Sequence, residues 1–533
     1  MIRSRRPLAL AALVAASAVA ASAPVVARPG ADATAAPVLT KLGSYDTGLT
    51  GESSGETAAL SGDRLFVTSA SDNVLDIVDV SDPAAPQRIT RVDLSPYGGG
   101  VQSVDAYGDL VAVAVQAPVR TDPGNVVFLR ADGTHVATVP VGALPDMLAF
   151  SPNGTRVAVA NEGEPSGYGQ AGSVDPEGSV TIIDTPRLRG KGRAPDVSRL
   201  ASTATFTAFN EGGPRHGELP AGIRLNGPGA TVAMDVEPEY VAWDHTGREV
   251  FVTLQENNAV ARVDAQSARV TSIAALGSID RRAAGFGFDP SDKDGGIRIA
   301  NWPVYALPMP DGIAAFRVKG STYYVTANEG DARDYPGFLD EARVKSLTLD
   351  PAAFPDAATL RKDPALGRLN VSTTDGKGPS GYTALYAFGS RSATVWTADG
   401  TRVWDSGDAF EQTVASRNPA AFNVDHADNA VDGRSDNKGP EPEGVAVGEV
   451  GKRTYAFVGL ERVGGVMVID VTDPRSSQVV DWVSNRDYAA MPTGPDSGAE
   501  IVKFYPGRGH KGGTLMVSNE ITATVTLYDV AAR

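Results

Sequence analysis

The hydrophobic and polar positions of this chain alternate in short runs, and the whole pattern recurs along the sequence. Each unit opens with a small residue or a proline, usually followed by an acid. An alternating apolar stretch, a turn and a second stretch rich in β-branched residues come next, then a third and sometimes a fourth stretch. Alternation with a period of two predicts half-buried β-strands. The openings are Gly55-Glu56, Val101-Gln102, Pro145-Asp146, Pro238-Glu239, Pro310-Asp311, Pro442-Glu443 and Ala499-Glu500.

These seven units predict an all-β chain folded as a seven-bladed β-propeller. Their basic spacing of ~45 residues, with three or four short strands per unit, is typical of propeller blades. A pair of β-sandwich domains is the alternative, but sandwiches do not explain seven similar openings. Second strands are expected at 65–69, 156–160, 250–254, 323–327, 455–459 and 515–518, and third strands at 74–80, 180–184, 466–471 and 522–530.

Three insertions lengthen the later units, at 186–230, 335–380 and 408–440. They are rich in Gly, Pro and Asp, which predicts long loops on one face of the propeller. The stretch 340–354 also suits a short helix.

The two ends of the repeat array predict how the propeller closes. The last unit ends after its third strand, at Val530, whereas the strand 39–45 precedes the first unit and has no partner there. This strand resembles the fourth strands at 87–94 and 135–141. We therefore expect it to complete the last blade, which removes an exposed sheet edge.

The N-terminus has the pattern of an export signal. Arg3, Arg5 and Arg6 precede an apolar run at 8–23, which is too short and too rich in alanine for a membrane span. We expect a signal peptide at 1–27, a linker at 28–38 and a single propeller domain at 39–533. Arginine pairs occur in twin-arginine signals and in ordinary secretory signals, and we favour the general secretory (Sec) route.

Composition and charge narrow the function further. The chain of 533 residues is 42% hydrophobic, enough for a sizeable core, and its net charge of -16 argues against a nucleic-acid partner. Without cysteine there are no disulfides, thiolate metal sites or cysteine nucleophiles. No second apolar run follows the signal, so we expect a secreted monomer with no membrane anchor in this chain.

The acids of the repeats should gather on one face. In a propeller the first strand of each blade lines the central channel and the second runs back antiparallel. The start of the first strand and the end of the second therefore lie together. Two like charges ~5 Å apart repel by ~3 kcal/mol at an effective dielectric of 20, so such a ring must bind cations, pair with basic groups or hold protons. The second strands end on Glu162, Glu256, Glu329, Glu461 and Glu520.

Oxygen ligands without cysteine, and with only five histidines, suit calcium or magnesium, and calcium is the more flexible of the two. Other divalent metals remain open. The alternative is structural, with each acid bonded to a neighbouring blade, and both readings stand at this stage. The predicted metal ligands are Asp146, Glu162, Glu239, Glu256, Asp311, Glu329, Glu443, Glu461, Glu500 and Glu520.

Three residues beside this ring are predicted to bind a ligand: Asn328, Arg333 and Arg462. A guanidinium there would hold a carboxylate or phosphate bidentately, while a cation bridges that ligand to Glu329 and Glu461. The alternative is that both arginines only neutralise the ring.

Two further acid-rich stretches resemble calcium loops but lack the spacing of an EF-hand, so we interpret them as solvated loops. They hold Asp289, Asp292 and Asp294 in one stretch, and Asp425, Asp428, Asp432 and Asp436 in the other.

Several long strings in the chain resemble the choice-of-anchor I family of bacterial exported proteins, over about residues 39–530. They include ANEGEPS, DPEGSVTIID, VEPEYVAW, VTLQENNAVARVD, SDKDGGIRIANWPVY, TANEGDARDY, RSDNKGPEPEGVAVGE and GLERVGGVMVIDV. The resemblance implies an exported β-propeller, and some members carry the label alkaline phosphatase-like. This chain departs from the pattern at Gly498-Ala499-Glu500, where Gly-Pro-Glu is favoured.

Signals for an enzyme are otherwise poor. The stretch 51–55 fits G-x-S-x-G, but no helix is expected after it, and no HExxH or P-loop motif is present. We therefore predict a calcium-binding extracellular binding or scaffold module. The alternative is a metal-dependent phosphoric ester hydrolase with unknown catalytic residues. The sequence does not disclose the natural ligand.

Overall fold

A computed structural model describes residues 36–49, 54–189, 196–490 and 494–533. The predicted signal peptide at 1–27 and most of the predicted linker lie outside these residues. The described residues all belong to one compact unit, Ala33–Arg533.

The described residues form mainly antiparallel sheets, and seven of these sheets have four strands each. The first three contain β2 (Ser54–Ser61), β3 (Arg64–Ser69), β4 (Val74–Asp79) and β5 (Gln87–Asp93); β6 (Gly100–Tyr107), β7 (Leu110–Gln116), β8 (Pro123–Arg130) and β9 (His135–Ala143); and β10 (Pro145–Phe150), β11 (Arg156–Asn161), β12 (Ser179–Asp184) and β13 (Ala201–Thr205).

The next three sheets follow the same order along the chain, with a large insertion inside the fifth. They contain β14 (Pro238–Trp243), β15 (Glu249–Leu254), β16 (Ala259–Asp264) and β17 (Arg269–Ala275); β20 (Ile313–Val318), β21 (Ser321–Ala327), β29 (Ala393–Thr397) and β30 (Arg402–Asp405); and β31 (Pro442–Val450), β32 (Arg453–Leu460), β33 (Val466–Asp470) and β34 (Gln478–Val483).

The seventh sheet joins the two ends of the described chain. Its order is β35 (Ala499–Pro506), β36 (Gly512–Asn519), β37 (Thr524–Ala531) and then β1 (Val38–Asp46). β1 pairs antiparallel with β37, from Val38 opposite Ala531 to Asp46 opposite Thr524. The Tyr45 hydroxyl also donates to the buried Asp76 carboxylate at 2.6 Å, so β1 contacts the first sheet as well.

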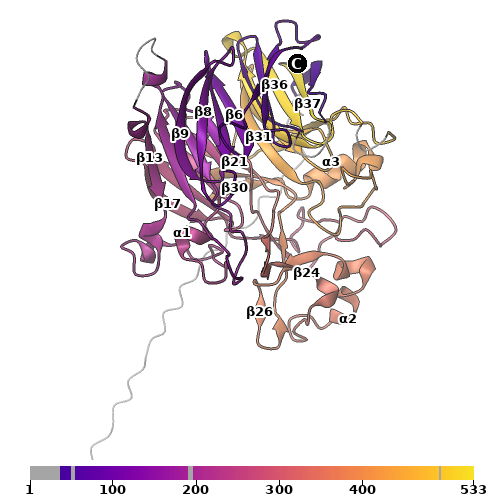
Figure 1. The fold of residues 1–533 in the computed structure, drawn as a ribbon. Coiled ribbons are helices and arrows are strands. Elements are labelled where there is room, and N and C mark those ends of the chain that lie inside the picture. The colour runs from indigo at the N-terminus through magenta and orange to yellow at the C-terminus, as the bar shows by residue number, and fades with distance from the viewer. Residues whose placement is uncertain (1–35, 50–53, 190–195, 491–493) are drawn as a thin grey trace, which may run out of the picture. The chain divides into compact units, whose positions relative to one another are not determined.

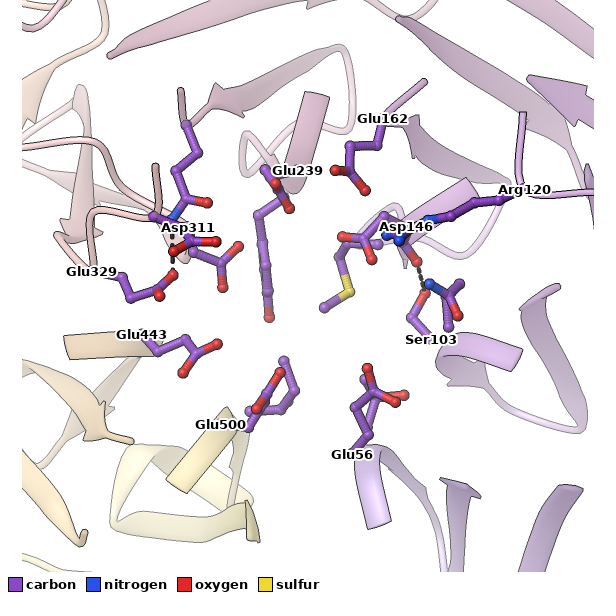
Figure 2. Close-up of a pocket in the computed structure, with 17 residues that line it drawn as sticks. Glu56, Ser103, Arg120, Asp146, Glu162, Glu239, Asp311, Glu329, Glu443 and Glu500 are labelled. Atoms are coloured by element: carbon purple, nitrogen blue, oxygen red, sulfur yellow. Dashed lines mark hydrogen bonds between the residues drawn. The ribbon is translucent and has the colours of Figure 1, made fainter. Parts of the chain in front are cut away.

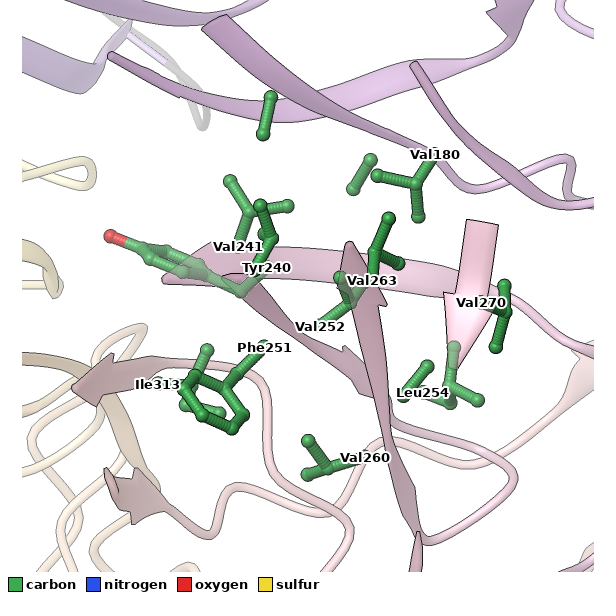
Figure 3. Close-up of a cluster of buried hydrophobic side chains, with 14 of the residues drawn as sticks. Val180, Tyr240, Val241, Phe251, Val252, Leu254, Val260, Val263, Val270 and Ile313 are labelled. Atoms are coloured by element: carbon green, nitrogen blue, oxygen red, sulfur yellow. The ribbon is translucent and has the colours of Figure 1, made fainter. Parts of the chain in front are cut away.

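The core lies in layers between consecutive sheets. The second strands of the sheets are runs of β-branched and small residues that are buried on both faces, as in β7 and β15. One hydrophobic cluster contains Val180 from β12 together with Val252, Val263 and Val270 from the next sheet (Figure 3). Stacking of sheets through such layers explains why these strands are nearly continuous hydrophobic runs.

The first strands of the seven sheets contact one another in chain order. β2 contacts β6, β6 contacts β10, and the series continues through β14, β20, β31 and β35, which contacts β2 again. Glycine permits this close approach: a Cβ on Gly444 would lie 2.0 Å from the Glu500 carbonyl oxygen, and one on Gly312 would lie 2.2 Å from that of Glu443. Four-stranded antiparallel sheets arranged in this way form a β-propeller (Figure 1).

The insertions carry more structure than the predicted loops. The first supplies the fourth strand of its sheet, β13, and 3-10 turns at Pro186–Leu188, Val197–Arg199, Thr207–Phe209 and His216–Glu218; helix α1 (Val232–Asp235) follows. The second contains paired short strands around a hydrophobic cluster that includes Val344, Leu366 and Val371. The third contains helix α3 (Ala409–Arg417), which packs against β34.

The remaining short elements lie before, within and just after the second insertion, and Figure 1 shows several of them near α2. They are β18 (Ile279–Asp280), β19 (Tyr305–Leu307), β22 (Asp334–Tyr335), β23 (Phe338–Leu339), β24 (Glu341–Arg343), β25 (Asn370–Ser372), β26 (Lys377–Gly378), β27 (Gly381–Tyr382), β28 (Tyr386–Phe388) and α2 (Ala357–Leu360), with turns at Val344–Ser346 and Asp363–Gly367. Two further turns are Pro419–Ala421 and Arg508–His510. None of the helices in the described ranges has the length and apolar character needed to cross a membrane.

Candidate functional site

The opening acids lie where the inner strands are irregular. In six of the four-stranded sheets the register between the first and second strands shifts across the opening residue, for example between Pro238 and Val241 around Glu239. A bulge of this kind re-aims a side chain away from the normal alternation. The same shift surrounds Glu56, Gln102, Asp146, Glu443 and Glu500. Asp311 lies just before β20.

Backbone hydrogen bonds hold the second set of acids beside the first. The N–H of Glu162 donates to the Leu144 carbonyl at 2.9 Å, and the N–H of Glu461 donates to the Glu441 carbonyl at 2.9 Å. Glu520 makes the same bond to Gly498. Each bond joins the end of a second strand to the residue that precedes the opening of its own sheet, so the two sets of acids share one face, as the sequence predicts.

The opening acids, together with Glu162, Glu329 and Asp331, surround a cavity of about 370 Å³ at the first strands (Figure 2). Met147, Tyr240 and Ile501 contribute apolar surface to its wall, and Arg120 is the one basic residue among the described residues that line it. The lining carboxylates are Glu56, Asp146, Glu162, Glu239, Asp311, Glu329, Asp331, Glu443 and Glu500.

Burial and mutual repulsion hold most of these carboxyl groups toward their neutral form. Burial, with the charge of Glu164 added, raises the pKa of Asp146 to about 7. Burial and then the charge of Glu162 raise the pKa of Glu239 well above its usual range. The Glu443 pKa is raised by burial and by Glu500. One carboxylate oxygen each of Glu56 and Glu443 is buried without a hydrogen-bond partner. The cavity therefore favours protons or cations at neutral pH.

One side of the cavity is neutralised by a buried lysine. The Lys438 ammonium lies 2.7 Å from Glu329, 3.2 Å from Asp331 and 3.4 Å from Glu441. Glu329 also accepts from the Gln255 amide at 2.8 Å (Figure 2). These contacts supply an internal cation to Glu329, and a second cation, Arg120, lies near Asp146 and pairs with Glu164.

Known sequences place this arrangement in a family. A sequence model described as the choice-of-anchor I domain matches residues 57–474. The chain belongs to the choice-of-anchor I family.

Two curated proteins resemble this choice-of-anchor I chain. The mesenchyme-specific cell surface glycoprotein of Strongylocentrotus purpuratus is 28% identical over 304 residues, which are 50% of this chain and 39% of that protein. Gigasin-3a of Magallana gigas is 30% identical over 191 residues, which are 32% of this chain and 67% of that protein. The chain thus spans less than half the length of the first relative.

Solved structures also resemble this choice-of-anchor I chain at low sequence identity. A chain of Kuenenia stuttgartiensis hydrazine synthase has a TM-score of 0.45 and 13% identity, and the match covers 91% of this chain and 98% of that one. The β-propeller domain of Myceliophteria thermophila Cps50 has a TM-score of 0.43 and 8% identity, and the match covers 93% and 100% of the two chains.

Seven of the ten predicted metal ligands line the cavity of this choice-of-anchor I protein, and three lie outside its wall. Glu256 is 5% exposed, and one of its carboxylate oxygens has no hydrogen-bond partner. Glu461 contacts Arg462 at 3.1 Å. Burial, followed by the charge of Glu461, raises the pKa of Glu520 to about 7. The assignment of all ten as metal ligands stays a prediction.

The three predicted ligand-binding residues do not line the cavity. Asn328 is fully buried, and its amide donates to the hydroxyls of Ser390 and Thr394. Arg333 is 2% exposed and lies 3.0 Å from Asp235 and 3.1 Å from Glu237.

Arg462 is likewise engaged, because its guanidinium contacts both Glu441, at 3.2 Å, and Glu461. These contacts match the alternative in which the two arginines neutralise carboxylates. Ligand binding at the three residues stays a prediction.

The two acid-rich stretches interpreted as solvated loops meet in the folded chain. Asp289, Asp294 and Asp432 each place a carboxylate oxygen within 4.8 Å of the other two, and all three are buried. Arg368 joins the same stretches at a second point, since it contacts Asp292 at 2.8 Å and Asp436 at 2.6 Å. Both stretches are therefore packed against other parts of the chain at these positions, which corrects their interpretation as solvated loops.

Sequence reasoning missed a second layer of charged residues. Glu237 and Glu441 are fully buried and each precedes a strand-opening proline, in the repeated string Glu-Pro-Glu. That duplication was the available signal. Lys438 and Arg120 had no signal, because their partners are distant in sequence: Lys438 contacts Glu329 across 109 residues, and Arg120 contacts Glu164 from another sheet's loop.

Proposed function

We propose that this chain is an exported, seven-bladed β-propeller whose acidic cavity binds calcium, and that it acts outside the cell as a binding or scaffold module. The observation that carries the proposal is the charge of the cavity wall. Nine carboxylates line the cavity, against one lining guanidinium, among the residues that the structure describes. A buried excess of negative charge on this scale calls for cations.

Calcium suits this cavity better than softer metals do. The wall offers carboxylate oxygens together with the amide and hydroxyl oxygens of Gln102, Gln255 and Thr57, and it includes neither histidine nor sulfur ligands apart from the Met147 thioether. Calcium takes six to eight oxygen ligands in flexible geometry, whereas magnesium demands a smaller octahedral shell. The lining glutamates come from four first strands and from the segments after two second strands, and such a set of long side chains adapts more readily to the larger ion.

Seven blades and closure by the N-terminal strand are supported by the sheet order. Each four-stranded sheet is one blade in this proposal, and the seventh blade takes β1 from the start of the chain and β35 to β37 from its end. The contact between β35 and β2 continues the series of inner-strand contacts. The pairing of β1 with β37 covers the free edge of β37, which is a common way to protect an exposed strand edge.

A role outside the cell is supported by the export-like N-terminal sequence and by the name of one relative, a cell surface glycoprotein. The absence of cysteine fits a fold that needs no disulfide for stability. The proposed module would present its insertions around the calcium-filled cavity to an extracellular ligand.

Calcium titration tests this proposal directly. The full chain is stripped with a chelator and titrated with calcium by calorimetry, and its melting temperature is followed in parallel. We expect binding heat and a higher melting temperature, since a ligand at 100 times its Kd stabilises the folded state by about 2.7 kcal/mol. The absence of both heat and thermal shift would overturn the proposal.

A matched pair of variants locates the bound ions. Glu239→Gln removes a cavity charge and should weaken calcium binding at least tenfold. Glu211→Gln makes the same chemical change at an exposed position in the first insertion and should leave binding unchanged. Equal losses in both variants would point to general charge effects.

A metal-dependent phosphoric ester hydrolase is the second candidate, favoured by Arg120. Its side chain is 55% exposed and lines the same cavity, so it can hold an anionic ester oxygen beside a bound cation. Chromogenic phosphomonoester and diester substrates with calcium, manganese or iron distinguish the candidates. Turnover that is lost in both Glu329→Gln and Arg120→Met would support the hydrolase, and no turnover would leave the binding module.

A further inference from the structure

A histidine and two glutamates converge beside the cavity without lining it. His426 lies in the third insertion, whereas Glu461 follows β32 and Glu520 follows β36. One ligand atom from each of the three residues lies within 4.8 Å of the other two. Three separate segments of the chain therefore bring one nitrogen and two carboxylate groups to a single point.

The three side chains are held firmly in this position. His426 is 7% exposed and Glu461 is 4% exposed. The Nδ1 atom of His426 lies 3.5 Å from Oε1 of Glu461. The backbone bond from the Glu520 N–H to Gly498 fixes the start of the third ligand. Preorganised ligands on different elements are what a metal site needs, because little ordering remains to be done on binding.

The mixed nitrogen and oxygen set indicates a class of metal different from that of the cavity. Imidazole with two carboxylates suits first-row transition metals such as manganese, iron or zinc, which accept nitrogen readily. Calcium prefers oxygen alone. The presence of His426 thus separates this cluster chemically from the all-oxygen cavity wall.

A guanidinium already contacts the same three-ligand cluster. Nη1 of Arg462 lies 2.6 Å from Nδ1 of His426 and also contacts Nε2 of the same ring, and its Nη2 lies 3.1 Å from Glu461. Because a guanidinium group only donates, it competes with a metal for the same lone pairs on these side chains. Nε of Arg462 lies 3.2 Å from Glu441, which gives the side chain an anchor away from the cluster.

We propose that His426, Glu461 and Glu520 form a transition-metal site in which the Arg462 guanidinium and a divalent metal compete for the same ligands. This goes beyond the proposed calcium cavity, with which the three residues share no wall position. When a metal enters, the guanidinium leaves His426 and Glu461 and keeps its contact with Glu441. The Arg462 side chain is 22% exposed, so solvent reaches it and the exchange needs no opening of the core.

Manganese binding to the full chain, saturated with calcium to fill the cavity, tests the site. Pulsed electron paramagnetic resonance reports nitrogen coupled to the bound manganese. We expect one imidazole nitrogen coupling in the wild type. His426→Gln should abolish it and weaken this manganese site at least tenfold. His245→Gln, at a side chain that is 42% exposed, serves as the control and should leave the coupling unchanged.

Replacement of Arg462 should change manganese affinity in the opposite direction to replacement of His426. Arg462→Met removes the competing cation, so manganese should bind at least tenfold more tightly, and the neutral variant Arg462→Gln tests the same point if the methionine variant fails to fold. A purely structural arginine would not produce tighter binding. Absence of nitrogen coupling in the wild type overturns this site even if calcium still binds the cavity. Nitrogen-coupled manganese without any calcium binding overturns the cavity proposal instead.

Discussion

Two acids in the string Glu441-Pro442-Glu443 show how position decides the role of a residue. Burial opposes the charge of Glu441, but Lys438, Arg434 and Arg462 together lower its pKa to about 2. Burial and the charge of Glu500 raise the pKa of Glu443. Glu441 is thus a fixed partner of buried cations, whereas Glu443, two positions later, lines the cavity with one carboxylate oxygen that has no hydrogen-bond partner.

Neutralising these two glutamates should change stability in opposite directions. Glu441→Gln leaves buried cations without their partner, so we expect the free energy of unfolding to fall by about 3–5 kcal/mol. Glu443→Gln removes a buried carboxyl whose ionisation is opposed by burial and by the charge of Glu500, so the calcium-free chain should become more stable. Chemical denaturation in chelator measures both values. A change of the same sign in the two variants would contradict this account.

The opening acids could be predicted from the sequence because each follows a recognisable strand-opening residue. Their counter-charges could not, because they depend on how the insertions fold. Lys438 belongs to the third insertion and meets Glu329 at the end of a different sheet. Arg333 finds Glu237 across 96 positions. Ion pairs between residues so far apart leave no local pattern. The sequence therefore could not distinguish acids that line the cavity from acids that pair with buried basic residues.

At the scale of elements, the alternation of apolar residues predicted strands correctly where a strand is packed between two neighbouring sheets. The expected second strand at 250–254 falls within β15 (Glu249–Leu254). β13 (Ala201–Thr205) was missed because its sequence, ASTAT, is polar and largely solvent-facing. The second insertion was interpreted as loop because it is rich in Gly, Pro and Asp, although Val344, Leu366 and Val371 meet in one cluster.

Removal of β1 tests the joining of the two chain ends. A chain that starts at Thr47 lacks the strand that pairs with β37, and it also loses the bond from Tyr45 to Asp76. We expect a lower midpoint in urea and concentration-dependent association through the exposed β37 edge. A chain that starts at Ala36 keeps β1 and serves as the control. Equal midpoints and a monomeric truncated chain would show that β1 is dispensable.

Across the whole described unit, acids and bases are unevenly distributed. Basic residues of the third insertion, such as Lys438 and Arg434, form ion pairs with Glu329 and Glu441. In contrast, burial and the charges of neighbouring acids raise the pKa values of Asp146 and Glu239. The fold therefore places mutually repelling carboxyl groups around its acidic cavity. Such a cavity is tolerated only when protons or cations are present, which links the stability of the unit to pH and to the binding of cations.

The pH dependence of stability follows from this linkage. The pKa values of Asp146, Glu237 and Glu520 are raised to about 7 in the folded chain, whereas unfolded carboxyls titrate near 4. Between about pH 4 and 7 the folded chain binds more protons than the unfolded chain, so its stability falls as pH rises, by up to about 1.4 kcal/mol per pH unit for each group. Glu441, whose pKa is lowered, contributes constantly across this window.

Calorimetric melting of the chelated chain from pH 5 to pH 8 should therefore show a falling melting temperature. Saturating calcium should flatten this slope, because bound cations stabilise the ionised carboxylates and replace the protons. Asp146→Asn removes one of the titrating groups and should reduce the slope without calcium. A calcium-free melting temperature that rises between pH 5 and pH 8 would mean that the cavity carboxylates are already satisfied within the protein, and the central charge would then need no cation.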